Sequence, residues 1–493
     1  MKTIAHAVKP CRNFIGGNWE PSASFDRRKI VDPATGDLLT ECPAATPEEV
    51  HKAVDAASHA FPEWSRTSVK DRVQYLFKFN ALIGEHMDEL TEILVREHGK
   101  MWADAKGDIQ RGKEVVEFST GMTDLLRGEA LWDAATSVDV RMVREPLGVT
   151  AGATPYNFPA MIPLWMLPVS IACGNTFILK PSDQAPMTAV RLVELLHETG
   201  LPPGVVNLVH GAKGVMDGLI GDARVKAISF VGSSAVAEQI YMRCAAAGKR
   251  VLSMGGAKNH LVVMPDADLA RTADAVINSA FGCTGQRCMA AAVLILVGDR
   301  PDQDRFFKAV YDRAEALRLG HGLYPDKYDM GPLTSQELYD RVLFFIGRGV
   351  QERAKLALDG RPKRSADYPD GLFMGATMFD DVGPDMAIAQ QEIFGPVLAV
   401  IRARTLDEAI EIQTRNLYGN GASIFTSSGA AARTFARRAS AGMIGVNVGV
   451  PVPRDPYAFG GWNRSAFGAG DITGSAAVRF WTRDKKITER WFV

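Results

Sequence analysis

Short apolar runs and helical segments alternate between Gly148 and Met254, and this alternation constrains the fold more than any other feature of the sequence. The apolar runs are VTAGATP, TFILKPS, VVNLVHG, VKAISFVGS and RVLSM. Helical segments separate them, the first from about Ala160 and the second from Thr188 to Gly200. This pattern is typical of a parallel sheet covered on both faces, which binds ligands at the carboxyl ends of its strands. The sequence therefore predicts an α/β fold with a doubly wound nucleotide-binding domain.

A second alternating region follows Cys288. AAAVLILV is expected to form a buried strand, and helices are expected near 302–318 and 335–352. AVIRART, a helix from Leu406 and ASIFTS continue the pattern. We therefore expect a second α/β domain.

The chain opens with a helical region. The segment TPEE at 46–49 combines a capping box with a proline at the first helical position, which predicts a helix start. Helical periodicity continues from Lys70 to about His98. Two or three long amphipathic helices are expected to precede the first sheet.

Composition excludes several classes of function. The 493 residues suffice for two or three domains, and 56 Lys and Arg against 57 Asp and Glu argue against nucleic-acid binding through bulk basicity. The most apolar stretch, 158–173, is too short to span a bilayer and contains three prolines. The six cysteines are scattered without a CxxC pair, and MKTIAHAVKP does not look like a secretory leader. Free thiols in a cytoplasmic protein are expected.

Five short motifs occur in order along the chain. They are PYNFP at 155–159, KPS at 180–182, FVGS at 230–233, GQRC at 285–288 and EIFGP at 392–396. Together they resemble the aldehyde dehydrogenase superfamily over essentially the whole chain. Within it, PYNFPAMIPLWMLP, GNTFILKPS, GAKNH, GQRCMA and GVNVGVPVP resemble the CoA-acylating methylmalonate/malonate semialdehyde dehydrogenases.

The resemblance implies the aldehyde dehydrogenase fold and a homo-tetramer. We expect an NAD-binding domain from 1–122 and 144–255, and a catalytic domain from 256–450. An oligomerisation element is expected from 123–143 and 451–493.

The motif GQRC places the candidate nucleophile at Cys288. A thiolate can add to an aldehyde carbonyl, tolerate hydride loss and then leave from a thioester. A free thiol with a pKa of about 8.5 needs activation, for which Arg287 and loop amides are candidates. Cys283 is the nearest rival, although its apolar neighbours favour a structural role. Asn157, with the Cys288 N–H, is the expected oxyanion donor.

The resemblance also implies an NAD site. Lys180, near Asp183 and Gln184, matches the lysine that binds the adenosine ribose, and a carboxylate at Asp183 disfavours NADP. Ser233 matches the turn where the pyrophosphate meets a helix N-terminus. The remaining candidate cofactor residues are Thr154, Tyr156, Gly255, Glu392 and Phe394. From its residue type alone, Glu392 could instead be a solvated surface carboxylate.

One expected catalytic group is missing. In hydrolytic relatives a glutamate about 34 residues before the cysteine activates water, but this position holds Met254, between Ser253 and Gly255. Coenzyme A is therefore the expected acyl acceptor.

Two arginines match the positions that hold the substrate carboxylate in this subfamily, namely Arg111 and Arg287. Paired guanidinium groups suit bidentate carboxylate recognition. Without the resemblance, Arg111 would be interpreted as an exposed helix arginine.

The expected reaction is the NAD-dependent oxidation of a short 3-oxo acid, with decarboxylation and transfer to CoA, and without a metal ion. Two alternatives remain open: a dehydrogenase of another short anionic aldehyde, such as a sulfonated one, and a catalytically silent binding paralogue. The intact Cys288, Asn157, Lys180 and Glu392 argue against the silent paralogue.

Overall fold

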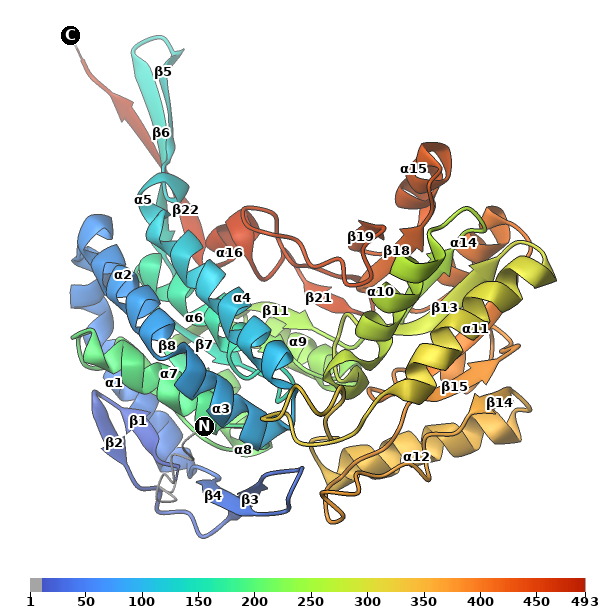
Figure 1. The fold of residues 1–493 in the computed structure, drawn as a ribbon. Helices are drawn as coiled ribbons and strands as arrows, with labels where there is room; N and C mark the ends of the chain where they lie inside the picture. Colours follow the sequence, from blue (N-terminus) through green and yellow to red (C-terminus); the bar gives the residue numbers. More distant parts are fainter. Residues whose placement is uncertain (1–10, 493) are drawn as a thin grey trace.

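The computed structural model describes residues 11–492, and its two large sheets confirm the predicted α/β class (Figure 1). The first sheet has the strand order β2-β1-β9-β8-β7-β10-β11-β21. Its strands are β1 (Asn13–Ile15), β2 (Asn18–Glu20), β7 (Val149–Ala153), β8 (Thr176–Lys180), β9 (Val206–Leu208), β10 (Val225–Val231), β11 (Arg250–Met254) and β21 (Ala466–Gly468).

The central five strands of this sheet are parallel, and they are the five apolar runs of the sequence. The chain runs outward from β7 in both directions, which is the doubly wound order. Ala153 pairs with Lys180, and Val231 pairs with Met254. The carboxyl ends of the strands therefore lie along one edge. The sequence did not predict the antiparallel additions β1, β2 and β21.

The second sheet has the order β14-β15-β16-β13-β12-β18-β19 and is parallel except at β14. Its strands are β12 (Asn259–Val263), β13 (Ala291–Val297), β14 (Lys355–Leu358), β15 (Thr377–Asp380), β16 (Val397–Ala403), β18 (Gly421–Phe425) and β19 (Met443–Val446). Separate apolar clusters cover its two faces. This confirms the second α/β region.

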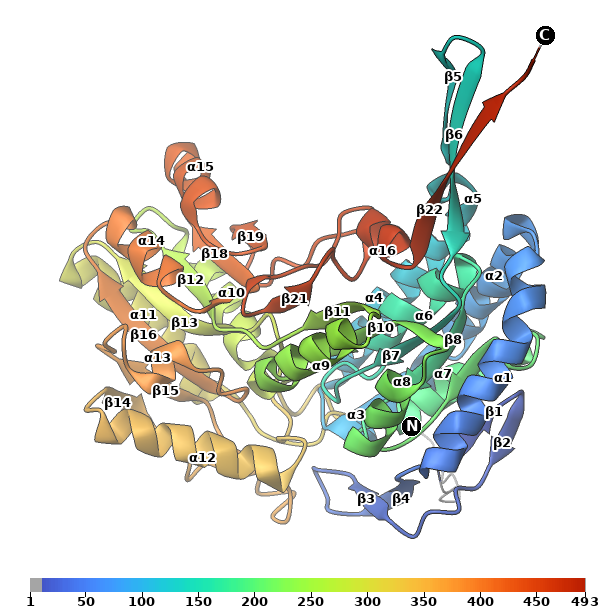
Figure 2. The same cartoon turned by 180° about the vertical axis from the view of Figure 1, so that it is seen from behind.

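Helices cover both sheets (Figure 2). Around the first sheet lie α1 (Pro47–Arg66), α2 (Val69–Glu85), α3 (Met87–His98), α4 (Trp102–Thr120), α5 (Met122–Leu125), α6 (Met161–Ala172), α7 (Met187–Glu198), α8 (Lys213–Gly221), α9 (Ser234–Ala246) and α16 (Gly474–Phe480). The others are α10 (Leu269–Phe281), the 3-10 turn η1 (Gly282–Gly285), α11 (Arg300–Ala316), α12 (Gln336–Gln351), α13 (Ala387–Gln390), α14 (Leu406–Thr414) and α15 (Gly429–Arg438).

The start of α1 is the predicted capping box. Thr46 Oγ1 accepts from the Glu49 N–H at 3.3 Å, and Glu49 Oε2 accepts from the Thr46 N–H at 2.9 Å. Both bonds satisfy amides that the first helical turn would otherwise leave unpaired.

A buried ion pair fixes the helices beside the first sheet. Lys100 Nζ donates to Asp108 Oδ2 at 2.8 Å, and Asp108 Oδ1 accepts from the Met161 N–H at 2.7 Å. These bonds join α4 to the first turn of α6. Because α6 follows PYNFP directly, they also fix the loop that carries Asn157.

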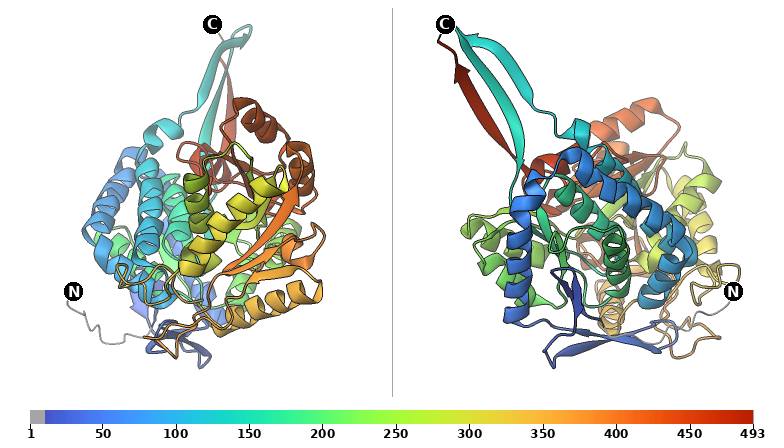
Figure 3. Two further views of the ribbon diagram at one scale, coloured as in Figure 1. Left: turned by 45° about the vertical axis from the view of Figure 1, so that its right-hand side comes forward. Right: turned by 90° about the vertical axis from the view of Figure 1, so that its left-hand side faces the viewer.

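A three-stranded sheet projects from the body of the molecule (Figures 1 and 3). It consists of β5 (Glu129–Ala135), β6 (Val138–Pro146) and β22 (Thr482–Arg490), in the order β22-β6-β5. Two short ladders complete the strands: β3 (Arg27–Val31) with β4 (Leu38–Pro43), and β17 (Tyr418–Gly419) with β20 (Trp462–Asn463). None of the helices in residues 11–492 combines the length and apolar character needed to cross a bilayer.

Candidate active site

Cys288 lies on a loop whose backbone takes an unusual path. Cys283, Thr284 and Gly285 have φ values of 49°, 56° and 73°, so three successive residues are left-handed. Such a conformation is costly for residues with a side chain and is concentrated at functional sites. A Cβ on Gly285 would collide with the Gly395 carbonyl. The motif GQRC therefore needs its glycine for the loop to approach the EIFGP segment.

Two asparagines hold the loop at the nucleophile. Asn259 Nδ2 donates to the Cys288 carbonyl at 2.8 Å, and Asn420 Nδ2 donates to the same oxygen at 3.0 Å. Asn259 begins β12, and Asn420 precedes β18. Sequence reasoning missed both residues because nothing local to either one indicates a partner on a distant loop.

The Cys288 thiol is half-buried, and its electrostatic surroundings differ from the expectation. Burial raises its pKa to about 12, and the Glu392 carboxylate contributes in the same direction. Its own backbone N–H, Lys100 and Arg287 lower the pKa, but more weakly. The expected activation by Arg287 therefore does not prevail.

Arg287 is committed to other partners. Its Nη2 donates to Asp104 Oδ1 at 2.5 Å, and its Nε donates to Cys283 Sγ at 3.2 Å. Asp104 shares the guanidinium charge, which explains the weak effect of Arg287 on the Cys288 pKa. Cys283 is fully enclosed beside Arg287, as expected for a structural thiol.

Arg111 is bonded near the same helix face as Asp104. It forms an ion pair with Glu114 and donates to the Pro453 carbonyl at 2.7 Å. Asp104 and Arg111 are two turns apart on α4, about 10 Å along its axis. Asp104 therefore brings Arg287 to the helix that carries Arg111, although no direct contact joins the two guanidinium groups.

Asn157 lies beside the nucleophile loop. Its side chain is buried, and Nδ2 donates to the Gln286 carbonyl at 3.1 Å. An amide nitrogen has two hydrogens, so one remains for a further acceptor. The Cys288 N–H donates to no other residue in the part of the chain that the structure describes. The loop that carries Asn157 therefore contacts the loop that carries the Cys288 N–H, which brings the two predicted oxyanion donors into the same part of the molecule.

The predicted adenosine residues gather at the ends of β7 and β8. The Thr154 N–H donates to the Lys180 carbonyl at 3.1 Å. Lys180 is buried, and within residues 11–492 its ammonium forms no hydrogen bond; burial lowers its pKa. Asp183 lies 3.8 Å from Arg28, and Gln184 follows in the same loop with a buried Oε1 that has no hydrogen-bond partner among residues 11–492.

The predicted pyrophosphate turn lies at the start of α9. Ser233 is the N-cap, and its side chain does not cap the helix. The next residue, Ser234, accepts from the Gly256 N–H at 2.8 Å. A Cβ on Gly255 would lie 2.7 Å from the Ser234 Oγ, so this close approach requires glycine. Because no side chain of the described residues caps α9, its first-turn amides can bind an anion.

Glu392 is not a solvated surface carboxylate. Its Oε1 accepts from the Ala257 N–H at 2.8 Å, and burial raises its pKa against the opposing effects of that N–H, Arg341 and Lys258. A small cavity is lined by Glu392 and Phe394 together with Gly285 and Arg287. EIFGP and the nucleophile loop therefore share one cavity.

Two aromatic side chains adjoin this cavity. Phe394 has a φ of 68°, which is unusual for an aromatic residue. Its ring packs edge-on against Tyr156, with centroids 6.1 Å apart, and Tyr156 stacks on His98 on another side. PYNFP and EIFGP thus contact each other, although more than 200 residues separate them.

A buried lysine was not predicted. Lys258 is 2% exposed, and its Nζ has no hydrogen-bond partner among the described residues. Burial lowers its pKa to about 7, while Glu392 acts in the opposite direction. Its position in GAKNH was the only signal that the sequence offered.

The positions that would hold the hydrolytic base carry no carboxylate. Ser253 and Met254 end β11, and both are buried. The carboxylate with the largest effect on the Cys288 pKa is Glu392. It follows Cys288 in the sequence, whereas Ser253 and Met254 precede it.

Comparisons with known proteins show the family to which the chain is similar. The model of the "Aldehyde dehydrogenase family" matches residues 19–487. Malonate-semialdehyde dehydrogenase 1 of Geobacillus kaustophilus is 46% identical over 97% of both chains. Malonate-semialdehyde dehydrogenase of Halalkalibacterium halodurans is 44% identical over 100% of both.

Solved structures of similar proteins have the same fold. The NAD complex of a Sinorhizobium meliloti 1021 protein assigned as a methylmalonate-semialdehyde dehydrogenase superposes with a TM-score of 0.97, at 43% identity and 99% coverage of each chain. Methylmalonate-semialdehyde dehydrogenase of Oceanimonas doudoroffii gives a TM-score of 0.96 at 40% identity, covering 98% of this chain and 99% of its own.

Proposed function

The chain belongs to the aldehyde dehydrogenase family, and on that premise we propose that it oxidises malonate or methylmalonate semialdehyde with NAD and transfers the acyl group to CoA. The observation that best supports this proposal is that Cys288, Asn157 and Glu392 lie around one loop. The positions of the hydrolytic base hold Ser253 and Met254, neither of which has a carboxylate. The products are acetyl-CoA or propionyl-CoA and carbon dioxide.

The residues present fit NAD. Lys180 offers a buried ammonium without a hydrogen-bond partner in residues 11–492, at the carboxyl end of β8. The first-turn amides of α9 receive no side-chain cap from the described residues, and a Cβ on Gly256 would collide with the Glu392 carboxylate. Lys180 would hold the adenosine ribose, and Glu392 the nicotinamide ribose. When bound, NAD accepts a hydride.

In the first half of the cycle, Cys288 binds the substrate covalently. Its thiol loses a proton to solvent, and Sγ forms a bond to the aldehyde carbon. The carbonyl oxygen becomes an oxyanion, to which the Asn157 amide and the Cys288 N–H donate hydrogen bonds. After hydride loss, the carbonyl re-forms and Cys288 carries a thioester.

In the second half, the acyl group leaves Cys288. The β-carboxylate departs as carbon dioxide, and the resulting carbanion, delocalised into the thioester carbonyl, takes up a proton. The CoA sulfur then attacks the thioester carbon, and the bond to Cys288 Sγ breaks. Ser253 and Met254 offer no base for water, which makes an external thiol the favoured acceptor.

Release of the acyl group is therefore expected to depend on CoA. Rapid mixing of enzyme, NAD and malonate semialdehyde without CoA should give a burst of about one NADH per Cys288, followed by a slow phase. Adding CoA should accelerate the steady phase at least about tenfold. Equally fast steady turnover without CoA would contradict the proposal. Loss of that steady turnover in Glu392→Gln, with the NADH burst unchanged so that NAD binding and hydride transfer are intact, would then identify Glu392 as the group that activates water.

Arg111 is proposed to read the substrate carboxylate. Charge-assisted hydrogen bonds contribute ~1.5–3 kcal/mol. Arg111→Leu should therefore lower kcat/KM for malonate semialdehyde by roughly 10- to 100-fold. Propanal lacks the carboxylate and should be affected much less, so kcat/KM is measured for both aldehydes. Arg111→Lys should recover part of the loss, because an ammonium lacks the planar fork.

Arg454 provides the matched control for Arg111. It pairs with the same Glu114 but is 68% exposed in its side chain. Arg454→Leu should change kcat/KM by no more than a few-fold for either aldehyde. Equal losses for acidic and neutral aldehydes in Arg111→Leu would assign Arg111 a structural role and favour a different anionic aldehyde or another carboxylate contact.

We also propose that the projecting sheet mediates homo-oligomer formation, with a tetramer as the expected assembly. The strand β5 is exposed along its whole length, and Leu131 and Trp132 are 63% and 79% exposed. Large apolar side chains on an open sheet edge favour pairing with another chain.

A further inference from the structure

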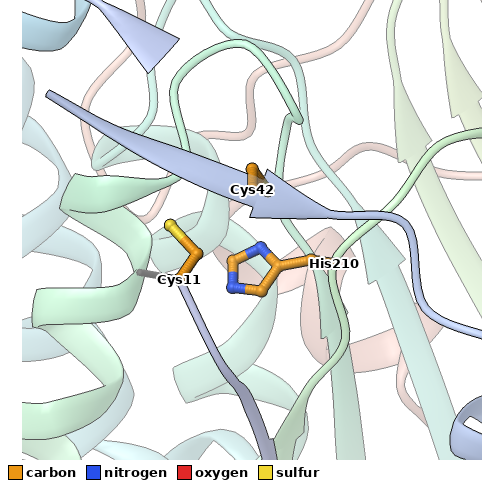
Figure 4. A group of neighbouring side chains, drawn as sticks. All are labelled: Cys11, Cys42 and His210. Atoms are coloured by element: carbon orange, nitrogen blue, oxygen red, sulfur yellow. The ribbon is translucent and has the colours of Figure 1, made fainter. Parts of the chain in front are cut away.

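Three soft ligand atoms gather outside the active site. Cys11, Cys42 and His210 each offer one ligand atom within 4.8 Å of the others, and all three residues are buried (Figure 4). The sequence showed scattered cysteines without a metal-binding spacing. The fold brings two of them together with a histidine that lies far away in the chain.

Hydrogen bonds hold the chain segments that carry these three residues. Cys11 precedes β1, and its N–H donates to the Glu41 carbonyl at 3.2 Å. Glu41 adjoins Cys42 on β4. The His210 N–H, just beyond β9, donates to Asn13 Oδ1 at 2.9 Å. The cluster is therefore held by three separate elements rather than by one flexible loop.

The hydrogen bonds of His210 leave one nitrogen free. Its Nε2 lies 3.1 Å from the Arg12 carbonyl, which can only accept, so Nε2 carries the proton. Nδ1 is then a lone-pair acceptor, and it is buried without any partner in the described part of the chain. In metal sites, a ligating histidine usually donates its other N–H to a carbonyl or carboxylate in this way.

We propose that Cys11, Cys42 and His210 Nδ1 bind one thiophilic metal ion of the zinc type. Two thiolates and one neutral imidazole are ligands that Zn²⁺ prefers, and this donor set without oxygen does not suit Mg²⁺ or Ca²⁺. Binding forms two metal–sulfur bonds and one metal–nitrogen bond, and it releases the two thiol protons. A water molecule would complete four-coordination.

The site has a defined place relative to the cofactor edge. Cys42 and Lys180 interact electrostatically, so the cluster lies near the residue proposed to hold the adenosine ribose. Because two thiolates balance the charge of Zn²⁺, metal binding adds no net charge beside Lys180. The ion would join the segment before β1, the strand β4 of the separate β3–β4 ladder and the segment after β9, which is a structural role separate from the Cys288 cycle.

The test measures metal content rather than activity. Cys288→Ala serves as the background, because the nucleophilic thiol could itself bind zinc. The full-length chain is incubated with ZnSO₄ and desalted, and bound zinc is measured by mass spectrometry, with affinity measured by competition against a chromogenic chelator. Cys42→Ser is compared with Cys244→Ser, a buried free cysteine on α9 outside the cluster.

The background and Cys244→Ser should each bind about one zinc per chain, whereas Cys42→Ser should bind at least about 100-fold more weakly. Zinc should also protect Cys11 and Cys42 from alkylation. If Cys42→Ser does not fold, His210→Gln replaces it, and Co²⁺ added to the background should give a sulfur-to-metal absorption band that His210→Gln alters. Zinc binding that is absent, or unchanged in both variants, would overturn the proposal. A Cys11–Cys42 disulfide in the freshly purified chain would also overturn the proposal, if this disulfide prevents zinc from binding.

Discussion

Cys288→Ala is expected to reduce NADH formation from malonate semialdehyde by about 10⁴-fold or more, because no other group can form the thioester. Binding of NAD, measured by quenching of tryptophan fluorescence, should survive, since Lys180, Ser233 and Glu392 are unchanged. Neither NADH burst nor steady phase should remain, with or without CoA.

The matched control is Cys283→Ala. This thiol lies only five positions earlier, but burial raises its pKa to about 11, and Arg287 Nε donates to its sulfur. Replacing Cys283 with alanine should lower the rate of NADH formation only modestly, because Arg287 loses one hydrogen-bond partner and can shift. Substantial turnover in Cys288→Ala would contradict the assignment of the nucleophile. Complete loss in a folded Cys283→Ala would transfer the role to Cys283.

The two α/β regions could be predicted because each parallel strand is a short apolar run bounded by polar turns. VTAGATP and TFILKPS are examples, and both became fully buried strands. Strand β12 was missed because NHLVV begins with two polar residues. Asn259 and His260 are nonetheless buried, since Asn259 bonds to the nucleophile loop and His260 to a backbone carbonyl. Long-range partners override local pattern at such positions.

In the candidate site, too, local sequence context identified some residues, whereas contacts between distant segments could not be predicted. Motifs identified Cys288, Lys180 and Glu392 because each stands in a short, specific sequence context. The sequence could not predict that Asp104 engages Arg287, since these residues are 183 positions apart. The grouping of Cys11, Cys42 and His210 was invisible for the same reason: three elements from distant parts of the chain create it.

The electrostatics of Cys288 also depend on tertiary structure. Adjacency to Arg287 suggested a lowered pKa, but burial and Glu392 outweigh it, and the pKa rises to about 12. Glu392 comes from a segment more than 100 residues away. A single neighbouring charge in the sequence therefore predicts the pKa of a buried thiol poorly.

Asn157→Ala is expected to lower kcat for malonate semialdehyde by roughly 100- to 1000-fold, the usual cost of removing one oxyanion donor. The amide stabilises charge that develops only after Cys288 attacks, so kcat should fall while KM changes little. Steady-state NADH formation with saturating NAD and CoA measures both parameters.

A purely structural role of Asn157 makes a different prediction. Its Nδ2 also donates to the Gln286 carbonyl, so the variant could displace the nucleophile loop. Alkylation of Cys288 by iodoacetamide reports loop position without forming an oxyanion, and its rate should stay within a few-fold in Asn157→Ala. Asn420→Ala is the contrast, because Asn420 holds the Cys288 carbonyl and has no proposed oxyanion role. It should change alkylation and NADH formation together. If Asn157→Ala behaves like Asn420→Ala, the amide positions the loop, and the Cys288 N–H is left as the only proposed oxyanion donor.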